Sequence, residues 1–224
     1  MAVFQKRRTA FPVPRGFTVT AHSGCMELPA NSIEAMQAGI EAGAQIVEFD
    51  LQFTPDGDPV LSHDAPQGAC VPLRDAFAFL AAHPDIRANV DVKSTAFLER
   101  VEPLARETGV LDRIFFTGVR EADIPTVREK CPATPYYWNV KIPRFANVEK
   151  LAEKTRALGA IGVNFSAGSL SARLTRTFRR HGLLTSVWTI DSVKKARRVL
   201  AMQPDNVTSR RPDRIVSLIE KGET

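Results

Sequence analysis

Short apolar runs alternate with longer amphipathic stretches along the whole chain. The runs are rich in residues that favour strands, and there are eight of them: Phe17–His22, Ile46–Phe53, Asn89–Val92, Ile114–Thr117, Tyr136–Val140, Ile161–Phe165, Leu184–Ile190 and Asp205–Thr208. The stretches between them repeat their apolar positions with the period of a helix: Ser32–Ala42, Leu73–Ala82, Ala96–Glu107, Glu121–Lys130, Val148–Leu158, Ser169–Arg180, Val193–Met202 and Pro212–Lys221. Each predicted strand is therefore followed by a predicted helix.

Eight strand–helix repeats predict a closed parallel (β/α)8 barrel. The 224 residues leave about 28 for each repeat, close to the minimum for such a unit, so we expect one domain over residues 1–224. The turn sequence Thr54-Pro55-Asp56-Gly57 predicts that the second strand continues into a hairpin with Pro59–His63. An open doubly wound sheet is the alternative, but it would place a glycine-rich phosphate loop after the first strand, and His22–Cys25 is not one.

Acidic side chains and a lysine lie near the ends of the second and third predicted strands. In a barrel of this kind the active site lies at the carboxyl ends of the strands. Glu48 and Asp50 are two residues apart, so they point to one face of the second strand, and Asp91 and Lys93 do the same in the third. The sequence therefore predicts that three carboxylates and one ammonium group meet at one rim.

Such a group of carboxylates requires a compensating charge. Two carboxylates about 4 Å apart repel each other by roughly 4 kcal/mol at an effective dielectric constant near 20. Lys93 offsets part of this repulsion, and a divalent cation would offset it for Glu48, Asp50 and Asp91 together. Oxygen ligands favour Mg²⁺ or Ca²⁺ and, less strongly, Mn²⁺, whereas ligation by a histidine would suit a softer metal.

Two histidines flank these acids in the predicted topology. His22 ends the first strand and His63 ends the hairpin. Metal-assisted phosphoryl chemistry needs one group to activate the attacking oxygen and another to protonate the leaving oxygen, and histidine titrates in the suitable range. We therefore expect His22, His63 and Lys93 to be the catalytic residues, without an assignment of base and acid.

Later strand ends offer residues that would contact a substrate. Trp188 and Phe165 are candidates for the wall of an alcohol pocket, and Asn164 and Arg210 for polar contacts. Thr117, Trp138 and Asn139 occupy comparable positions on the fourth and fifth strands.

Composition narrows the class of protein. Hydrophobic residues make up 44% of the chain, and none of its apolar runs reaches the roughly 18 residues of a membrane span. Three widely spaced cysteines and the lack of a signal-peptide pattern predict free thiols and a cytoplasmic location. The net charge of +5 would attract an anionic small molecule, but the basic clusters lack the aromatic or glycine interleaving of nucleic-acid binders. The sequence sets no oligomeric state.

The segment Ala21–Asp64 closely resembles the signature of the glycerophosphodiester phosphodiesterase family; it reads AHSGCMELPANSIEAMQAGIEAGAQIVEFDLQFTPDGDPVLSHD. A thinner resemblance continues through Asn89–Ser94, Val187–Asp191 and Asp205–Asp213. The family implies a (β/α)8 barrel, a divalent metal, and hydrolysis of a glycerophosphodiester to glycerol 3-phosphate and an alcohol in lipid metabolism. It also implies metal ligation by Glu48, Asp50 and Asp91, acid–base roles for His22 and His63, and a phosphate-facing Lys93.

Four features depart from the family pattern. Ser23 stands where the family has a phosphate-binding arginine, for which Arg210 or Lys141 is a candidate substitute, and Ala30 stands where it has a glutamate. Asp91 replaces a glutamate, and only 27 residues separate His63 from Asp91, where the family inserts a small subdomain.

Two alternative functions follow from these departures. The Asp-x-Lys variant and the missing insertion also resemble the sphingomyelinase D-like phospholipases, which cleave lipid phosphodiesters through a cyclic phosphate. Ser23 and Ala30 are in turn compatible with a barrel that binds a phosphorylated ligand without turnover.

Overall fold

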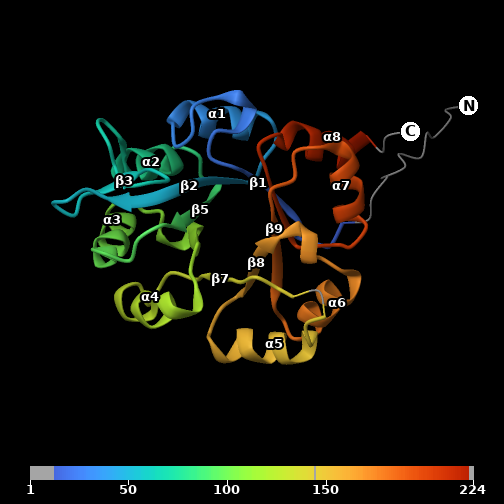
Figure 1. The fold of residues 1–224 in the computed structure, drawn as a ribbon. Coiled ribbons are helices and arrows are strands. Elements are labelled where there is room, and N and C mark those ends of the chain that lie inside the picture. The colour runs from blue at the N-terminus through green and yellow to red at the C-terminus, as the bar shows by residue number, and fades with distance from the viewer. Residues whose placement is uncertain (1–12, 144, 222–224) are drawn as a thin grey trace, which may run out of the picture.

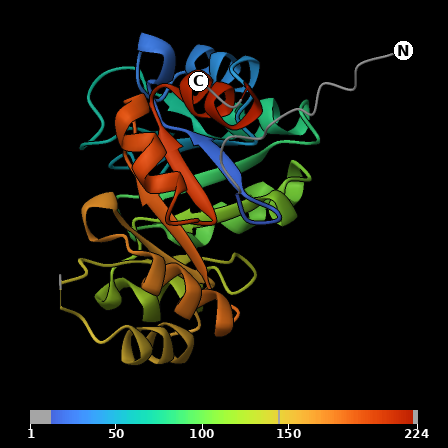
Figure 2. The same ribbon diagram turned by 90° about the vertical axis from the view of Figure 1, so that its right-hand side faces the viewer.

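The computed structural model describes residues 13–143 and 145–221, and in them it confirms the predicted (β/α)8 architecture (Figure 1). The strands of the ring are β1 (Thr18–Ala21), β2 (Ile46–Phe53), β5 (Arg87–Val92), β6 (Ile114–Thr117), β7 (Tyr137–Asn139), β8 (Gly162–Ser166), β9 (Leu184–Trp188) and β10 (Asn206–Ser209). The helices are α1 (Ile33–Glu41), α2 (Leu73–Ala81), α3 (Val101–Glu107), α4 (Ile124–Lys130), α5 (Val148–Ala157), α6 (Ala172–Arg180), α7 (Val193–Leu200) and α8 (Pro212–Lys221). Figures 1 and 2 together show the helices outside the strands.

The strands of the ring are parallel and follow the order β6-β5-β2-β1-β10-β9-β8-β7. No ladder joins β6 to β7 within the described residues. An isolated bridge between Phe116 and Tyr136 lies there instead, with the Phe116 amide donating to the Pro135 carbonyl at 2.9 Å. The ring therefore has one seam at which strand pairing is reduced.

The predicted hairpin leaves the ring from the end of β2. Strand β3 (Pro59–Leu61) runs antiparallel to β2, and the two-residue strand β4 (Val71–Pro72) continues this extension. Gly57 closes the turn at a φ of 85°, and a Cβ there would lie 2.8 Å from the Phe97 ring, so the turn requires glycine. Strand β4 was not predicted from the sequence.

Alternation along the strands separates the core from the interior of the ring. In β2, Val47, Phe49 and Leu51 are at most 1% exposed and belong to the main hydrophobic core. Glu48 and Asp50 alternate with them and therefore point to the opposite face, into the ring. The same alternation brings Asn89 and Asp91 of β5 to the ring interior, beside Glu48 and Asp50.

Some predicted boundaries are wrong by a few residues. The predicted helix Ala96–Glu107 begins only at Leu98, with the 3-10 turn Leu98–Arg100 leading directly into α3, because Phe97 adopts a φ of 53° that no helix continues through. The predicted helix Ser169–Arg180 begins only at Ala172, after the 3-10 turn Ala167–Ser169. None of the helices in the described residues combines the length and the apolar character that crossing a bilayer requires.

Candidate active site

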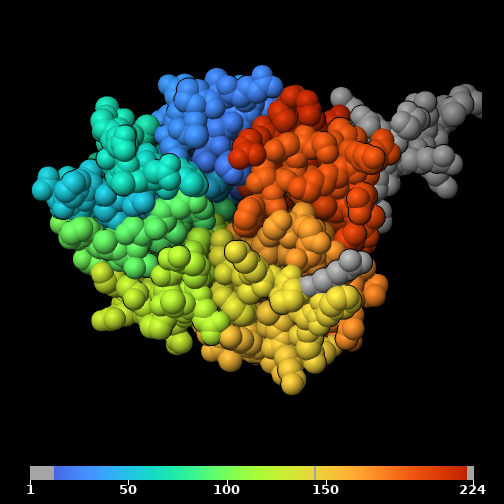
Figure 3. All heavy atoms as spheres, viewed as in Figure 1, coloured from blue at the N-terminus to red at the C-terminus, as the bar shows by residue number. Residues whose placement is uncertain are grey.

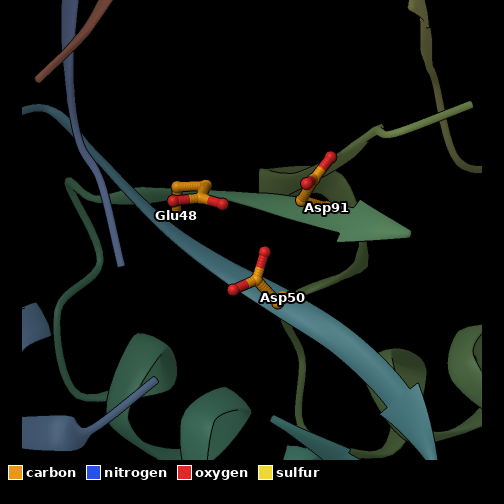
Figure 4. A group of neighbouring side chains, drawn as sticks. All are labelled: Glu48, Asp50 and Asp91. Carbon is orange, nitrogen blue, oxygen red and sulfur yellow. The ribbon is translucent and has the colours of Figure 1, made fainter. Parts of the chain in front are cut away.

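Three carboxylates from adjacent strands meet at one place inside the ring. Asp50 of β2 is in register with Asp91 of β5, and Glu48 lies two residues earlier on the same face of β2. One carboxylate oxygen from each of the three lies within 4.8 Å of the other two, and the side chains converge in Figure 4. Glu48 and Asp50 are buried, at 6% and 3% exposure. The structure thus brings together the three predicted metal ligands.

The electrostatics of the cluster reflect this crowding. Burial raises the pKa of Glu48 well above its usual value, and the nearby Asp50 and Asp91 raise it further. The Lys93 ammonium lies 3.0 Å from Asp50 Oδ1 and also contacts Asp91 Oδ2. Burial alone would lower the pKa of Lys93, but these two carboxylates outweigh burial and raise it. One lysine therefore compensates two of the three acids.

Two residues that precede β2 in the chain hold the carboxylates in place. The Ser23 amide donates to Glu48 Oε2 at 2.7 Å, and its hydroxyl donates to Asp50 Oδ2 at 3.3 Å. Asn31 donates from Nδ2 to Asp50 Oδ2 and accepts from the Asp50 amide, both at 2.9 Å. Ser23 is therefore turned toward the acids, and it lacks the positive charge of the arginine that the family has there.

The acidic cluster fits a hard divalent cation. Its donors are carboxylate oxygens, which Mg²⁺ and Ca²⁺ prefer. Burial and the neighbouring carboxylates both raise the pKa of Glu48 and so disfavour its ionised form, which a bound cation would stabilise. Glu48, Asp50 and Asp91 are the residues that would hold it.

His22 lies directly after β1, beside this cluster. Its Nδ1 is 2.7 Å from the Ser23 carbonyl oxygen, an acceptor, so Nδ1 carries the hydrogen and Nε2 is the free nitrogen of the neutral ring. The same Nδ1 is 3.7 Å from Glu48 Oε2. Burial lowers the pKa of His22, the hydrogen bond to Ser23 raises it, and the positive charge of Arg210 lowers it again, with a net lowering.

His63 lies two residues beyond β3 and is much more exposed. Its side chain is 68% exposed, and its Nδ1 lies 3.0 Å from Asp64 Oδ1. Both histidines line the same cleft as the acids.

The cleft has a volume of about 560 Å³ and contains most of the predicted site. Its lining includes His22, Glu48, Asp50, His63, Asp91, Lys93, Thr117, Asn139, Asn164, Trp188 and Arg210. Phe165 does not line it. That side chain is 1% exposed and packs in the main core, because it alternates along β8 with the inward-facing Asn164. Trp138 is likewise buried, and Lys141 lies outside the lining.

Sequence reasoning missed several residues of the cleft, and Arg120 is the most important of them. Asn89 and Thr208 also line it. Arg120 follows β6, and its Nε donates to Asp123 at 2.9 Å. Between β6 and Arg120, a Cβ at Gly118 would lie 2.4 Å from the Val92 carbonyl oxygen and 2.7 Å from Asp91 Oδ1, so this loop packs directly against the acidic cluster. The sequence did contain a signal for Arg120, because an arginine three residues after the end of β6 lies at the end of the barrel where the active site is expected.

Comparison with known proteins agrees with this geometry. Residues 22–77, which include both histidines and two of the three acids, match the glycerophosphoryl diester phosphodiesterase family. A glycerophosphodiester phosphodiesterase of Caldanaerobacter subterraneus is 19% identical over 242 residues, covering 91% of this chain and 98% of the relative.

Solved structures of low sequence identity share the fold. A glycerophosphoryl diester phosphodiesterase of Silicibacter pomeroyi superposes with a TM-score of 0.79 at 16% identity, covering 94% of this chain and 95% of that one. A phosphodiesterase of Oleispira antarctica, solved with the product sn-glycerol-3-phosphate, superposes with a TM-score of 0.73 at 18% identity, covering 93% of this chain and 97% of that one. The matched motif and the shared barrel therefore make this chain similar to glycerophosphodiester phosphodiesterases, in the sequence of residues 22–77 and in fold.

Proposed function

We propose that this chain is a divalent-metal-dependent glycerophosphodiester phosphodiesterase, which hydrolyses its substrate to glycerol 3-phosphate and an alcohol. The observation that carries the proposal is the meeting of Glu48, Asp50 and Asp91 within 4.8 Å, in a cleft that His22 and Lys93 also line. Members of the family are phosphoric diester hydrolases, and the Oleispira relative was solved with sn-glycerol-3-phosphate as its product.

The proposed mechanism uses the acidic cluster to bind and the histidines to transfer protons. A Mg²⁺ or Ca²⁺ ion held by Glu48, Asp50 and Asp91 would supply Lewis-acid polarisation of the phosphoryl oxygens. Lys93 adds positive charge where negative charge develops in the transition state. The free Nε2 of His22 accepts or donates one proton and His63 handles the other, one acting on the attacking water and one on the leaving alcohol.

The remaining cleft residues are proposed to bind the two halves of the substrate. Trp188 offers an apolar face to the alcohol, and Asn164 offers its amide. Arg210 lies beside His22 and is proposed to contact the phosphate in place of the arginine that Ser23 replaces. We propose that one domain carries the whole site and that the enzyme works in the cytoplasm, which the three free cysteines support.

A hydrolysis assay tests the proposal. Glycerophosphocholine is offered to the wild-type protein before and after treatment with EDTA, and to His22→Ala. We expect glycerol 3-phosphate from the wild type, loss of turnover with EDTA, recovery on addition of Mg²⁺ or Ca²⁺, and at least about a hundredfold lower kcat in His22→Ala. Turnover that neither EDTA nor His22→Ala reduces would place the active site elsewhere.

The same assay separates the two alternative functions. A cyclic glycerophosphate as the first product would indicate the phospholipase D-like reaction. Binding of glycerol 3-phosphate with no hydrolysis under any metal condition would indicate a barrel that binds its ligand without turnover.

A further inference from the structure

Positive charge gathers on one half of the rim around the cleft. Lys141 follows β7, Arg173 lies in the first turn of α6, and Lys194 and Lys195 lie in the first turn of α7. All four side chains are exposed, and we call them the basic rim. Because every helix of a parallel barrel begins at the carboxyl ends of the strands, all four lie at the end of the barrel where the cleft opens. In positions 140–151, 167–175 and 189–196, the acidic residues are Asp191, which pairs with Arg210, and Glu149, which pairs with Arg180 and His181.

The other half of the rim carries the opposite charge. Taken together, the segments that follow β1, β2, β5 and β6 contain seven acidic residues and three basic ones; the acids are Glu27, Asp56, Asp58, Asp64, Glu99, Glu121 and Asp123. In Figure 3 the yellow and orange segments, which carry the basic rim, occupy the half of the molecule opposite the cyan and green segments. The molecule is therefore electrically polarised across the cleft.

Two large aromatic side chains are exposed in the basic half. Phe145, in the segment between β7 and α5, is 93% exposed, and Trp188, at the end of β9, is 42% exposed. Ser169 donates to the Ile142 carbonyl at 2.7 Å, so the segments that follow β7 and β8 are in contact. Lys195 Nζ donates to the Thr189 carbonyl at 2.7 Å, which holds this lysine beside Trp188. Exposed aromatic groups bordered by lysines are the combination that favours the boundary between water and lipid headgroups.

We propose that the basic rim, together with Phe145 and Trp188, docks on an anionic lipid surface. The positive charges match the negative headgroups, and the two rings enter the headgroup layer. A nucleic-acid strand lying across the cleft would continue past the acidic half and be repelled there. A bilayer is flat, so the molecule can tilt and leave the acidic half in water. Trp188 also lines the cleft, so docking brings the opening of the cleft to the lipid headgroups. This inference concerns binding alone and does not rest on the hydrolysis proposed above.

Flotation with lipid vesicles tests the proposal. The wild type is mixed with vesicles of phosphatidylcholine and with vesicles that also contain phosphatidylglycerol. We expect binding to the anionic vesicles that weakens at high salt, since screening shortens the range of the attraction. The double variant Lys141→Glu with Lys194→Glu is expected to partition about tenfold less or lower, and Phe145→Ala to partition less than the wild type.

A matched variant controls for charge and folding. Arg128→Glu with Arg198→Glu makes the same change in net charge at the last turns of α4 and α7, at the opposite end of the barrel, and is expected to bind like the wild type. Unchanged thermal unfolding shows that the variants remain folded. Equal binding to neutral and anionic vesicles, or equal losses in both double variants, would overturn the proposal. Binding to a DNA duplex without binding to either kind of vesicle would also overturn it.

Discussion

Ser23 contacts both the acidic cluster and His22, but it supplies no positive charge for a phosphate. Its amide and hydroxyl bind Glu48 and Asp50, and its carbonyl accepts from His22. It therefore organises the acids and sets the tautomer of His22 without offering charge to a phosphate. The positive groups of the cleft are Lys93, Arg120 and Arg210, which come from other segments.

Arg120 is expected to bind the substrate anion. It lies in a loop that packs against Asp91, and its Nε is occupied by Asp123, which orients the guanidinium. Losing one charge-assisted contact costs about 1.5–3 kcal/mol. We expect Arg120→Ala to raise KM for a glycerophosphodiester about tenfold or more and to change kcat much less. Arg128→Ala, in α4 and outside the cleft, is the control, and equal KM values for the two variants would contradict the assignment.

Arg210 is expected to tune the titration of His22. The guanidinium lowers the pKa of His22, because a positive charge nearby disfavours the protonated ring. In Arg210→Ala this effect is lost and Asp191 loses its partner, so the pKa of His22 should rise. The limb of the pH–rate profile that belongs to His22 should therefore move to higher pH. A profile of unchanged position, or one shifted to lower pH, would show that the two groups are not coupled.

At the scale of elements, β2 is positioned by its contact with α2. Phe49 of β2 packs edge-to-face on Phe77 of α2, with ring centroids 6.5 Å apart, and both are at most 1% exposed. We expect Phe77→Ala to lower the free energy of unfolding by about 3–5 kcal/mol, measured by urea denaturation. Phe97→Ala removes a ring that is 37% exposed and should cost clearly less. If both variants lost the same free energy of unfolding, the contact between α2 and β2 would not be a major contribution to stability.

The strands and the acids could be predicted because they follow simple periods. Alternation in β2 puts Glu48 and Asp50 on one face whatever the surrounding loops do, and parallel neighbours bring Asp91 beside them. The prediction that Phe165 lines the cleft was wrong, because Asn164 beside it is the residue that faces into the ring. Adjacent residues of a strand face opposite sides, and the sequence did not fix which of these two faces inward.

Loops and turns could not be predicted in the same way. Asn31 adopts a φ of 60°, which turns its amide toward Asp50, while Ser32 caps α1. Arg120 enters the cleft because Gly118 allows the loop to pass against β5. These placements depend on backbone conformations that hydrophobic patterns do not encode.

At the scale of the whole molecule, the parallel ring concentrates chemistry at one end. Residues that are far apart in the sequence, from His22 to Arg210, line one cleft because they follow or end neighbouring strands. The short segment between His63 and Asp91 forms β4 and α2 and contains no inserted subdomain. The cleft is consequently bordered by the strand ends and their loops.

The central claim is that Glu48, Asp50 and Asp91 form a metal site, and calorimetric titration of the metal-free protein with Mg²⁺ and Ca²⁺ tests it most directly. We expect saturable binding to the wild type that strengthens as pH rises, because the pKa of Glu48 is raised and its proton competes with the ion. Asp91→Asn should bind at least about tenfold more weakly, and Asp64→Asn, which changes an exposed acid outside the cluster, should bind like the wild type. Equal affinity in Asp91→Asn and the wild type, or no binding by the wild type, would contradict the account.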